Sequence, residues 1–299
     1  MRIVVSGSTG FIGTALVRAI EQRGDDVVRL RRGAAGDAGP VWDPEAGTIS
    51  DDAFDGADAV IHLAGEGIGE KKWTPEQKRR ILESRTKGTT LIARTLAQRS
   101  NKPAVLVSGS AVGYYGDRGD EILDEDSSSG DDFLADACRQ WEAAAQPVVA
   151  AGIRLVTIRT GIVLDPRGGV LKQLLPPFRF GLGGRTGSGR QWMSWITLGD
   201  AVGAILHAVD HDSMRGPVNL TAPNPATNAG LTHALGKALH RPTALPTPLF
   251  PLKMIYGSEL VAALLVAGQR VTPSRLLDNA YPFAHTELEP AFREMLGRL

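Results

Sequence analysis

The stretch that decides the fold of this chain spans residues 3–13 and reads IVVSGSTGFIG. It opens with a short, continuous apolar run, which is typical of a buried parallel strand. Gly7, Gly10 and Gly13 follow at a spacing of three, and apolar residues then recur at helical spacing. A strand, a glycine turn and a helix in this order predict backbone amides and a helix N-terminus that bind a pyrophosphate. The alternative is a tight turn that binds no ligand.

Strand-like and helical segments alternate beyond this turn. Apolar strands are predicted near residues 27–30, 58–64, 104–107 and 155–158, and long helices near 75–96 and 133–150. This alternation implies right-handed βαβ crossovers, and therefore an α/β fold with a Rossmann-type, doubly wound parallel sheet. We expect an NADP-binding domain over residues 1–222, which includes a loop-rich substrate segment over 161–196. A small, mostly helical C-terminal lobe is expected over 223–299.

Composition narrows the class of protein. The 33 basic and 33 acidic residues give a formal net charge of zero over 299 residues. That balance argues against nucleic acid as a partner and favours self-association, for example as a homodimer. The single cysteine, Cys138, excludes an intramolecular disulfide and suits a reducing compartment. The longest apolar run, 260–267, is far short of the roughly 18 residues that span a bilayer. No signal-peptide pattern is found, so we expect a cytoplasmic protein without a membrane span.

Two arginines end the second predicted strand. An acidic residue at this point would accept a hydrogen bond from the ribose 2′-hydroxyl of NAD. The chain has Arg31 and Arg32 there instead. Two guanidinium groups can bind a 2′-phosphate bidentately. The predicted cofactor is therefore NADP(H), and the alternative is a solvated basic pair.

Further motifs carry a family resemblance. They are Asp58-x-Val60-Ile61-His62-Leu63-Ala64-Gly65, Ser108-Gly109-Ser110 and Gly113-Tyr114-Tyr115-Gly116. With the glycine turn, they resemble the extended short-chain dehydrogenase/reductase superfamily, the NAD-dependent nucleotide-sugar epimerases and dehydratases, over about residues 1–220. Other segments are similar to an atypical subgroup of epimerase-family proteins, loosely called SulA-like, which ends in a small uncharacterised domain. These segments are Trp73-Thr74-Pro75, Ser84-Arg85, Asp132 to Glu142, Arg159-Thr160-Gly161, Gly189 to Ile196, and the piece from about Leu249.

The resemblance implies NADP(H) bound across the carboxyl ends of the strands, but the catalytic pattern of the superfamily is altered. The superfamily places a Tyr and a Lys four residues apart on one helix, where the Lys lowers the pKa of the proton-donating Tyr. The corresponding positions are Leu134 and Cys138, and neither side chain can take over these roles. The usual Asn falls at Arg85. Of the usual catalytic set, only the serine remains, as Ser110.

Three interpretations stay open. The first is an oxidoreductase or epimerase that acts on a small polar or nucleotide-sugar-like substrate. Tyr114 or Tyr115 would then be the acid/base, and Ser110 and Arg85 would orient a substrate carbonyl. The second is a non-catalytic regulator or sensor that binds NADPH. The third makes Cys138 a reactive thiol near the nicotinamide, which requires positive charge to lower its pKa; otherwise Cys138 is a core residue and Arg85 an ordinary surface charge.

Other candidate residues are interpreted from their surroundings. No Cys/His cluster has metal-ligand spacing, so no metal is expected. His62, inside an apolar strand, is expected to be a hydrogen-bonded buried imidazole. Arg185 and Arg190 belong to a glycine-rich loop that either binds a diphosphate or covers the site. The residues expected to contact the cofactor are Gly7, Thr9, Gly10, Phe11, Ile12, Gly13, Arg31, Arg32, Leu63, Ala64, Gly65, Arg85, Ser108, Cys138, Thr160, Gly161 and Ile162.

Overall fold

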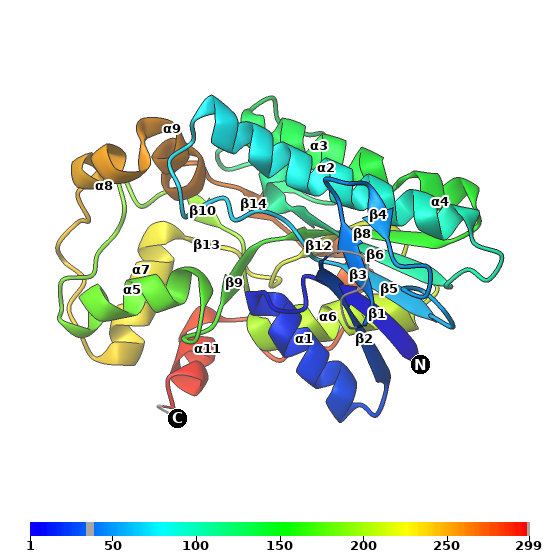
Figure 1. Cartoon of the computed structure of the whole chain (residues 1–299). Helices are drawn as coiled ribbons and strands as arrows, with labels where there is room; N and C mark the ends of the chain where they lie inside the picture. Colours follow the sequence, from blue (N-terminus) through cyan, green and yellow to red (C-terminus); the bar gives the residue numbers. More distant parts are fainter. Residues whose placement is uncertain (34–38, 298–299) are drawn as a thin grey trace.

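A computed structural model describes residues 1–33 and 39–297 of the chain. Its central element is an eight-stranded sheet with the order β12-β8-β6-β5-β1-β2-β3-β4 (Figure 1). Neighbouring strands run parallel except for the pair β3 and β4. The order reverses direction between β1 and β5, which is where dinucleotides bind in such sheets. The strands are β1 Arg2–Ser6, β2 Asp26–Arg32, β3 Val41–Asp43, β4 Thr48–Ile49, β5 Ala59–His62, β6 Val105–Ala111, β8 Arg154–Thr160 and β12 Gly216–Leu220.

Helices cover both faces of this sheet (Figure 1). On one face, α1 (Phe11–Gln22) and α6 (Leu198–Asp210) bury an apolar layer against the strands. On the other face lie α2 (Pro75–Gln98), α3 (Phe133–Ala145) and α4 (Pro147–Ala150). The predicted α/β fold with a doubly wound sheet is confirmed.

The segment 161–196 contains more regular structure than its prolines and glycines predict. It forms β9 (Ile162–Leu164), α5 (Gly169–Arg179), β10 (Trp192–Met193) and β11 (Trp195–Thr197). The helix forms in spite of Pro176 and Pro177 because Leu171, Leu175 and Phe178 recur at helical spacing and are buried. Both prolines lie in its last turn, so the hydrogen bonds that they cannot donate are lost only at the C-terminal end of the helix.

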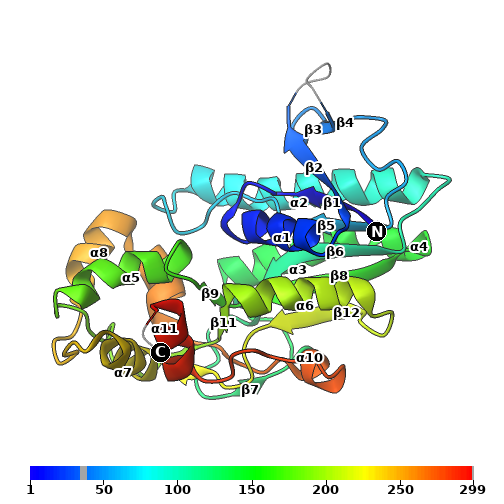
Figure 2. The ribbon, with the colours of Figure 1, turned by 90° about the horizontal axis from the view of Figure 1, so that it is seen from below.

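Elements beyond residue 222 interleave with the rest of the chain. They are β13 (Ala226–Thr227), α7 (Asn228–Leu239), α8 (Leu249–Tyr256), α9 (Ser258–Val261), the π-helix η2 (Ala262–Val266), β14 (Arg270–Val271), α10 (Ser274–Asp278) and α11 (Leu288–Met295). Helices α7 and α11 share an apolar core with α5, and β14 pairs with β7 (Ile122–Leu123). Figure 2 shows α5, α7 and α8 gathered at one end of the molecule. The predicted domain boundary at residue 222 stays a prediction.

Candidate functional site

The turn between β1 and α1 requires glycine at two positions. Gly7 has φ +72°, and a Cβ there would lie 2.8 Å from the Ala64 amide nitrogen. A Cβ at Gly13 would lie 2.1 Å from the Gly7 carbonyl oxygen. Side chains at either position would therefore push the first turn of α1 away from the strand ends.

The N-terminus of α1 is open to an anion. Thr9 and Gly10 are exposed, and Gly10, the N-cap residue, supplies no side-chain cap. The amides of the first turn, at Phe11, Ile12 and Gly13, have no partner within the helix. The first turn also carries no acidic residue, so the positive end of the helix dipole is not neutralised. The cradle fits a pyrophosphate.

Both arginines that end β2 are exposed. The Arg32 side chain borders a hollow of about 200 Å³, together with Gly33, Trp42 and Ser84. Two carboxylates also border it, and both are engaged elsewhere. Glu45 accepts a hydrogen bond from Lys87 at 2.8 Å, and Asp43 accepts from backbone amides. Arg32 therefore presents a positive charge to the hollow in which the 2′-phosphate is predicted to bind.

The end of β5 lies beside the glycine turn. Leu63 donates its amide hydrogen to the Ser6 carbonyl oxygen at 3.2 Å, and Ala64 and Gly65 continue past it. A Cβ at Gly65 would lie 3.5 Å from the guanidinium carbon of Arg85. The strand ends predicted to flank the cofactor are therefore adjacent.

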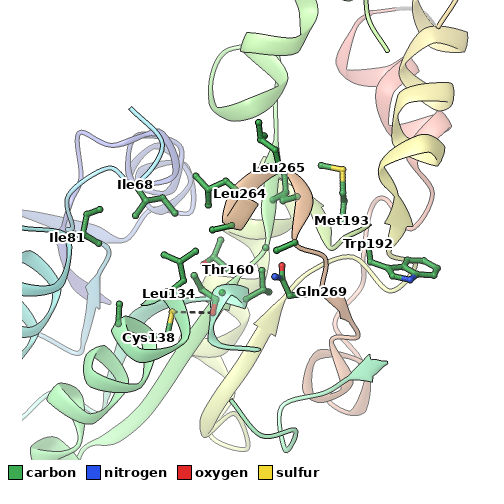
Figure 3. Close-up of a pocket in the computed structure, with 18 of the residues that line it drawn as sticks. Ile68, Ile81, Leu134, Cys138, Thr160, Trp192, Met193, Leu264, Leu265 and Gln269 are labelled. Carbon is green, nitrogen blue, oxygen red and sulfur yellow. Dashed lines mark hydrogen bonds between the residues drawn. The ribbon is translucent and has the colours of Figure 1, made fainter. Parts of the chain in front are cut away.

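A cavity of about 200 Å³ lies at the carboxyl ends of β6 and β8 (Figure 3). Apolar side chains dominate its wall, and η2 contributes Leu264 and Leu265 from far along the sequence. Five residues expected to contact the cofactor are part of the lining: Arg85, Cys138, Thr160, Gly161 and Ile162. The cavity therefore brings together residues from α2, α3 and the β8–β9 junction.

Arg85 is the one fully charged side chain among the described residues that line the cavity. Its Nη1 donates to the carbonyl oxygens of Glu66 and Ile81, both at 3.0 Å. Its guanidinium carbon lies 5.0 Å from the centroid of the Trp141 ring. Burial lowers the pKa of Arg85 from its usual value, although a guanidinium stays protonated in proteins. Within the part of the chain that the structure describes, its Nε and Nη2 have no hydrogen-bond partner, which leaves them for a ligand.

Leu134 and Cys138 line the same cavity from α3. The Cys138 thiol donates to the Ala111 carbonyl oxygen at 3.7 Å. Burial, followed by the charge of Glu142, raises the pKa of Cys138 to about 12. The environment expected of a reactive cysteine is the opposite one, with a lowered pKa.

A buried polar network holds the predicted Ser110 and Tyr115. The Ser110 hydroxyl donates to Glu142 Oε1 at 2.7 Å, and Arg159 donates to both Glu142 oxygens at 2.8 and 3.0 Å. The Tyr115 hydroxyl accepts from Arg159 at 3.0 Å and donates to Asn219 at 2.7 Å. Burial raises the pKa of Tyr115 to about 12. Among the described residues, neither Ser110 nor Tyr115 lines the cavity.

The remaining predicted residues lie outside the cavity. The Tyr114 ring stacks on the Arg159 guanidinium, 3.5 Å from ring centroid to guanidinium carbon. The buried Ser108 hydroxyl has no hydrogen-bond partner within the described part of the chain. Arg185 is exposed and donates to the Ser188 carbonyl oxygen at 2.8 Å. His62 is the expected buried imidazole, bonded to Ser6 and to Thr89 of α2.

Residues 1–33 and 39–297 contain neither a membrane-spanning helix nor a cluster of metal-ligating side chains. No helix there is long and apolar enough to cross a membrane. No group of three or more His, Cys, Asp or Glu residues there could hold a metal ion.

Comparisons with known proteins agree with this geometry. The family model described as the NAD dependent epimerase/dehydratase family matches residues 3–144, and one for a domain of unknown function, DUF1731, matches residues 247–295. An epimerase family protein of Mycobacterium leprae is 39% identical over 97% of this chain and 94% of its own length.

Two solved structures are similar over nearly the whole chain. The human epimerase family protein SDR39U1, crystallised with NADPH, is 35% identical, covers 100% of both chains and has a TM-score of 0.89. A nucleoside-diphosphate sugar epimerase of Corynebacterium glutamicum is 36% identical and has a TM-score of 0.82. That match covers 99% of this chain and 58% of the other.

Proposed function

The chain belongs to the NAD-dependent epimerase/dehydratase family, and we propose that it is an NADP(H)-dependent oxidoreductase that works without the usual Tyr–Lys pair. One observation carries the proposal. Five residues expected to contact the cofactor line a single cavity at the carboxyl ends of β6 and β8, in the same sheet whose strand β1 leads into the open N-terminus of α1. The human relative that was crystallised with NADPH supports the choice of cofactor.

Three groups of residues would hold NADP(H). The first-turn amides of α1 bind the pyrophosphate. Arg31 and Arg32 bind the 2′-phosphate, and their side chains distinguish NADPH from NADH. Residues 160–162 and Cys138 line the cavity at the nicotinamide end.

The lining favours a compact, mostly apolar carbonyl compound over the polar or nucleotide-sugar-like substrate that the sequence predicts. Each buried sugar hydroxyl needs a hydrogen-bond partner. Besides Arg85 and the Cys138 thiol, the described lining offers polar side chains at Thr160, Gln191 and Gln269, while the Trp192 indole N–H is already bonded to Asp120. A small ligand with one carbonyl oxygen needs fewer partners.

Arg85 is proposed as the residue that orients this carbonyl. NADPH, when bound, supplies a hydride to an electrophilic carbon. The free Nε and Nη2 of Arg85 then stabilise the negative charge that develops on the carbonyl oxygen. Because the Cys138 thiol already donates its proton to the Ala111 carbonyl oxygen, we propose that water supplies the proton that this oxygen takes up.

Cofactor choice is tested by fluorescence titration with NADPH and NADH. Arg32→Ala is expected to weaken NADPH binding at least tenfold and leave NADH binding unchanged. Arg29→Ala is the matched control, because Arg29 lies exposed on the same strand and pairs with Glu21. Equal loss for both cofactors, or no loss, contradicts the assignment of the 2′-phosphate.

Turnover is tested by following NADPH oxidation with small aliphatic and aromatic aldehydes and ketones, and with UDP-glucose. Arg85→Met is expected to lower kcat/KM about 100-fold, the cost of one lost oxyanion donor. Arg94→Met, an exposed change on the same helix, is the control. Faster turnover of UDP-glucose than of any apolar carbonyl would contradict the proposed substrate class.

A second candidate is a regulatory protein that binds NADPH without turnover. It is favoured by one observation: Leu134 and a thiol with a raised pKa occupy the positions of the usual proton-transfer pair. The absence of NADPH oxidation across the panel, together with submicromolar NADPH binding, would favour this candidate over the enzyme.

We also propose, from the sequence, a domain division at residues 222/223, a homodimer and a cytoplasmic location. Limited proteolysis tests the division, because a linker at that boundary would be cut first. Light scattering tests the dimer, and fractionation of cells tests the location.

A further inference from the structure

The chain has no net charge as a whole, but its acidic residues are unevenly distributed along the sequence. Residues 169–191 and 229–258 contain no Asp or Glu. They contain seven basic residues: Lys172, Arg179, Arg185, Arg190, Lys237, Arg241 and Lys253. We call these two segments together the basic lobe.

The structure joins the two segments of the basic lobe. The Arg241 guanidinium donates to the Arg179 carbonyl oxygen at 2.8 Å. The Thr247 amide donates to the Arg185 carbonyl oxygen at 2.8 Å, and the Thr247 hydroxyl to that of Gly184 at 3.1 Å. Figures 1 and 2 both place α5, α7 and α8 together at one end of the molecule, away from the N-terminus. The basic lobe is therefore one end of the protein.

Large apolar side chains protrude from this end. Six of the eleven exposed large hydrophobic residues within the described chain belong to it, and each is at least 60% exposed. Helix α8 buries none of its eight residues. The six side chains come from α8 and from the two segments that pack beside each other: Phe180, Leu182, Leu245, Phe250, Met254 and Ile255.

Six of the seven cations of the basic lobe have no carboxylate partner among residues 1–33 and 39–297. Within the described residues, Lys237 is the one basic side chain of the lobe with a carboxylate partner, Glu289. Arg185 and Arg241 donate to backbone carbonyl oxygens instead. The surface therefore combines protruding apolar side chains with six cations that no carboxylate of the described chain neutralises.

We propose that the basic lobe docks on an anionic lipid bilayer, with α8 and the loops that carry Phe180, Leu182 and Leu245 reaching below the headgroups. Apolar side chains on a short helix and loop tips, flanked by Lys and Arg, match the chemistry of a membrane surface. A second copy of the chain fits less well, because a two-fold contact through this face would set its unpaired cations against one another. Through Gly257, α8 continues into α9 and η2, which lines the cavity.

The test is co-sedimentation of the full-length protein with vesicles. Binding is expected with vesicles of 70% phosphatidylcholine and 30% phosphatidylglycerol, at least tenfold above pure phosphatidylcholine, and it should fall in 0.5 M NaCl. Phe250→Ser with Met254→Ser is expected to lower binding at least tenfold, as is Arg179→Gln with Lys253→Gln. Ile122→Ser with Val149→Ser, two exposed apolar changes elsewhere, should leave it unchanged.

Thermal melting of each variant checks that it folds. Absence of vesicle binding overturns the proposal, and so does equal binding by the wild type and the folded Phe250/Met254 variant. Binding to polyglutamate without binding to anionic vesicles would also overturn it and indicate an acidic protein partner. A fall in oligomer mass in that variant, again without vesicle binding, would indicate a contact between copies of the chain.

Discussion

Arg159 donates two hydrogen bonds to the carboxylate of Glu142, from Nε at 2.8 Å and from Nη2 at 3.0 Å. Both side chains are almost fully buried. Burial by itself would lower the pKa of Arg159, but its hydrogen bonds and charge interaction with Glu142 outweigh burial and hold the pKa above its usual value. The pair joins β8 to α3 and holds the Ser110 hydroxyl in place.

Breaking this pair should be costly. Glu142→Ala leaves a buried guanidinium without its counter-ion, so we expect the free energy of unfolding to fall by about 3–5 kcal/mol. Urea unfolding measures the change. Glu83→Ala, which removes an exposed partner of Lys87, should cost no more than about 1 kcal/mol. A similar cost for both variants would show that the buried pair contributes little.

The glycine turn predicts a steric effect on cofactor binding. In Gly13→Ala the new methyl carbon would meet the Gly7 carbonyl oxygen, which lies 2.1 Å from its position. We expect a loss of about 1–3 kcal/mol of stability from overpacking and a much weaker affinity for NADPH. Gly199→Ala is the control, because its nearest neighbour lies 4.0 Å away. Unchanged NADPH affinity in Gly13→Ala would mean that the turn does not hold the pyrophosphate.

Local patterns predicted the cofactor, NADP(H), and the residues proposed to bind its phosphates. The turn from Gly7 to Gly13 and the arginines that end β2 depend on neighbours within one strand–turn–helix unit. The parallel, doubly wound sheet followed from the alternation of strands and helices. These features need no knowledge of which distant segments meet.

The rest of the site, around Ser110 and the cavity, depends on contacts between segments far apart in the sequence. Glu142 and Arg159 lie within motifs that carry the family resemblance, but their pairing with Ser110 requires α3 to face β8. Leu264 and Leu265 line the cavity from a π-helix more than 100 residues beyond the strands they cover. Their apolar run is too short to span a bilayer, and it carried no signal of a pocket wall.

His62 predicts a pH dependence of stability. Burial, followed by the charge of Arg32, lowers the pKa of His62 from 6.5 to about 4. Between pH 6.5 and pH 4, His62 is protonated in the unfolded chain but stays neutral in the folded chain. Its contribution to the free energy of unfolding is therefore complete above pH 6.5 and is lost as the pH falls toward 4. Between pH 7.5 and pH 5, protonation of His62 in the unfolded chain should lower the free energy of unfolding by about 2 kcal/mol. Urea unfolding at both values measures the loss.

His62→Gln should remove that part of the pH dependence, although it lowers stability at every pH because it breaks the bonds to Ser6 and Thr89. The exposed His240 is the control, and His240→Gln should keep the slope of the wild type. An unchanged slope in His62→Gln would show that another group causes the loss in acid.

The buried environment of Cys138 predicts that its thiol is unreactive. Because its pKa is raised to about 12, less than about one thiol in a thousand is ionised at pH 8, and the thiolate is the form that iodoacetamide alkylates. Alkylation followed by mass spectrometry should therefore be at least 100-fold slower in the native protein than in 6 M urea. A variant that combines Cys138→Ser with Ser100→Cys, which moves the thiol to an exposed position, should react at nearly the same rate in both conditions. Fast alkylation of native Cys138 would reverse the assignment, because it would require a thiolate stabilised by Arg85 and would restore the reactive-thiol interpretation of this site.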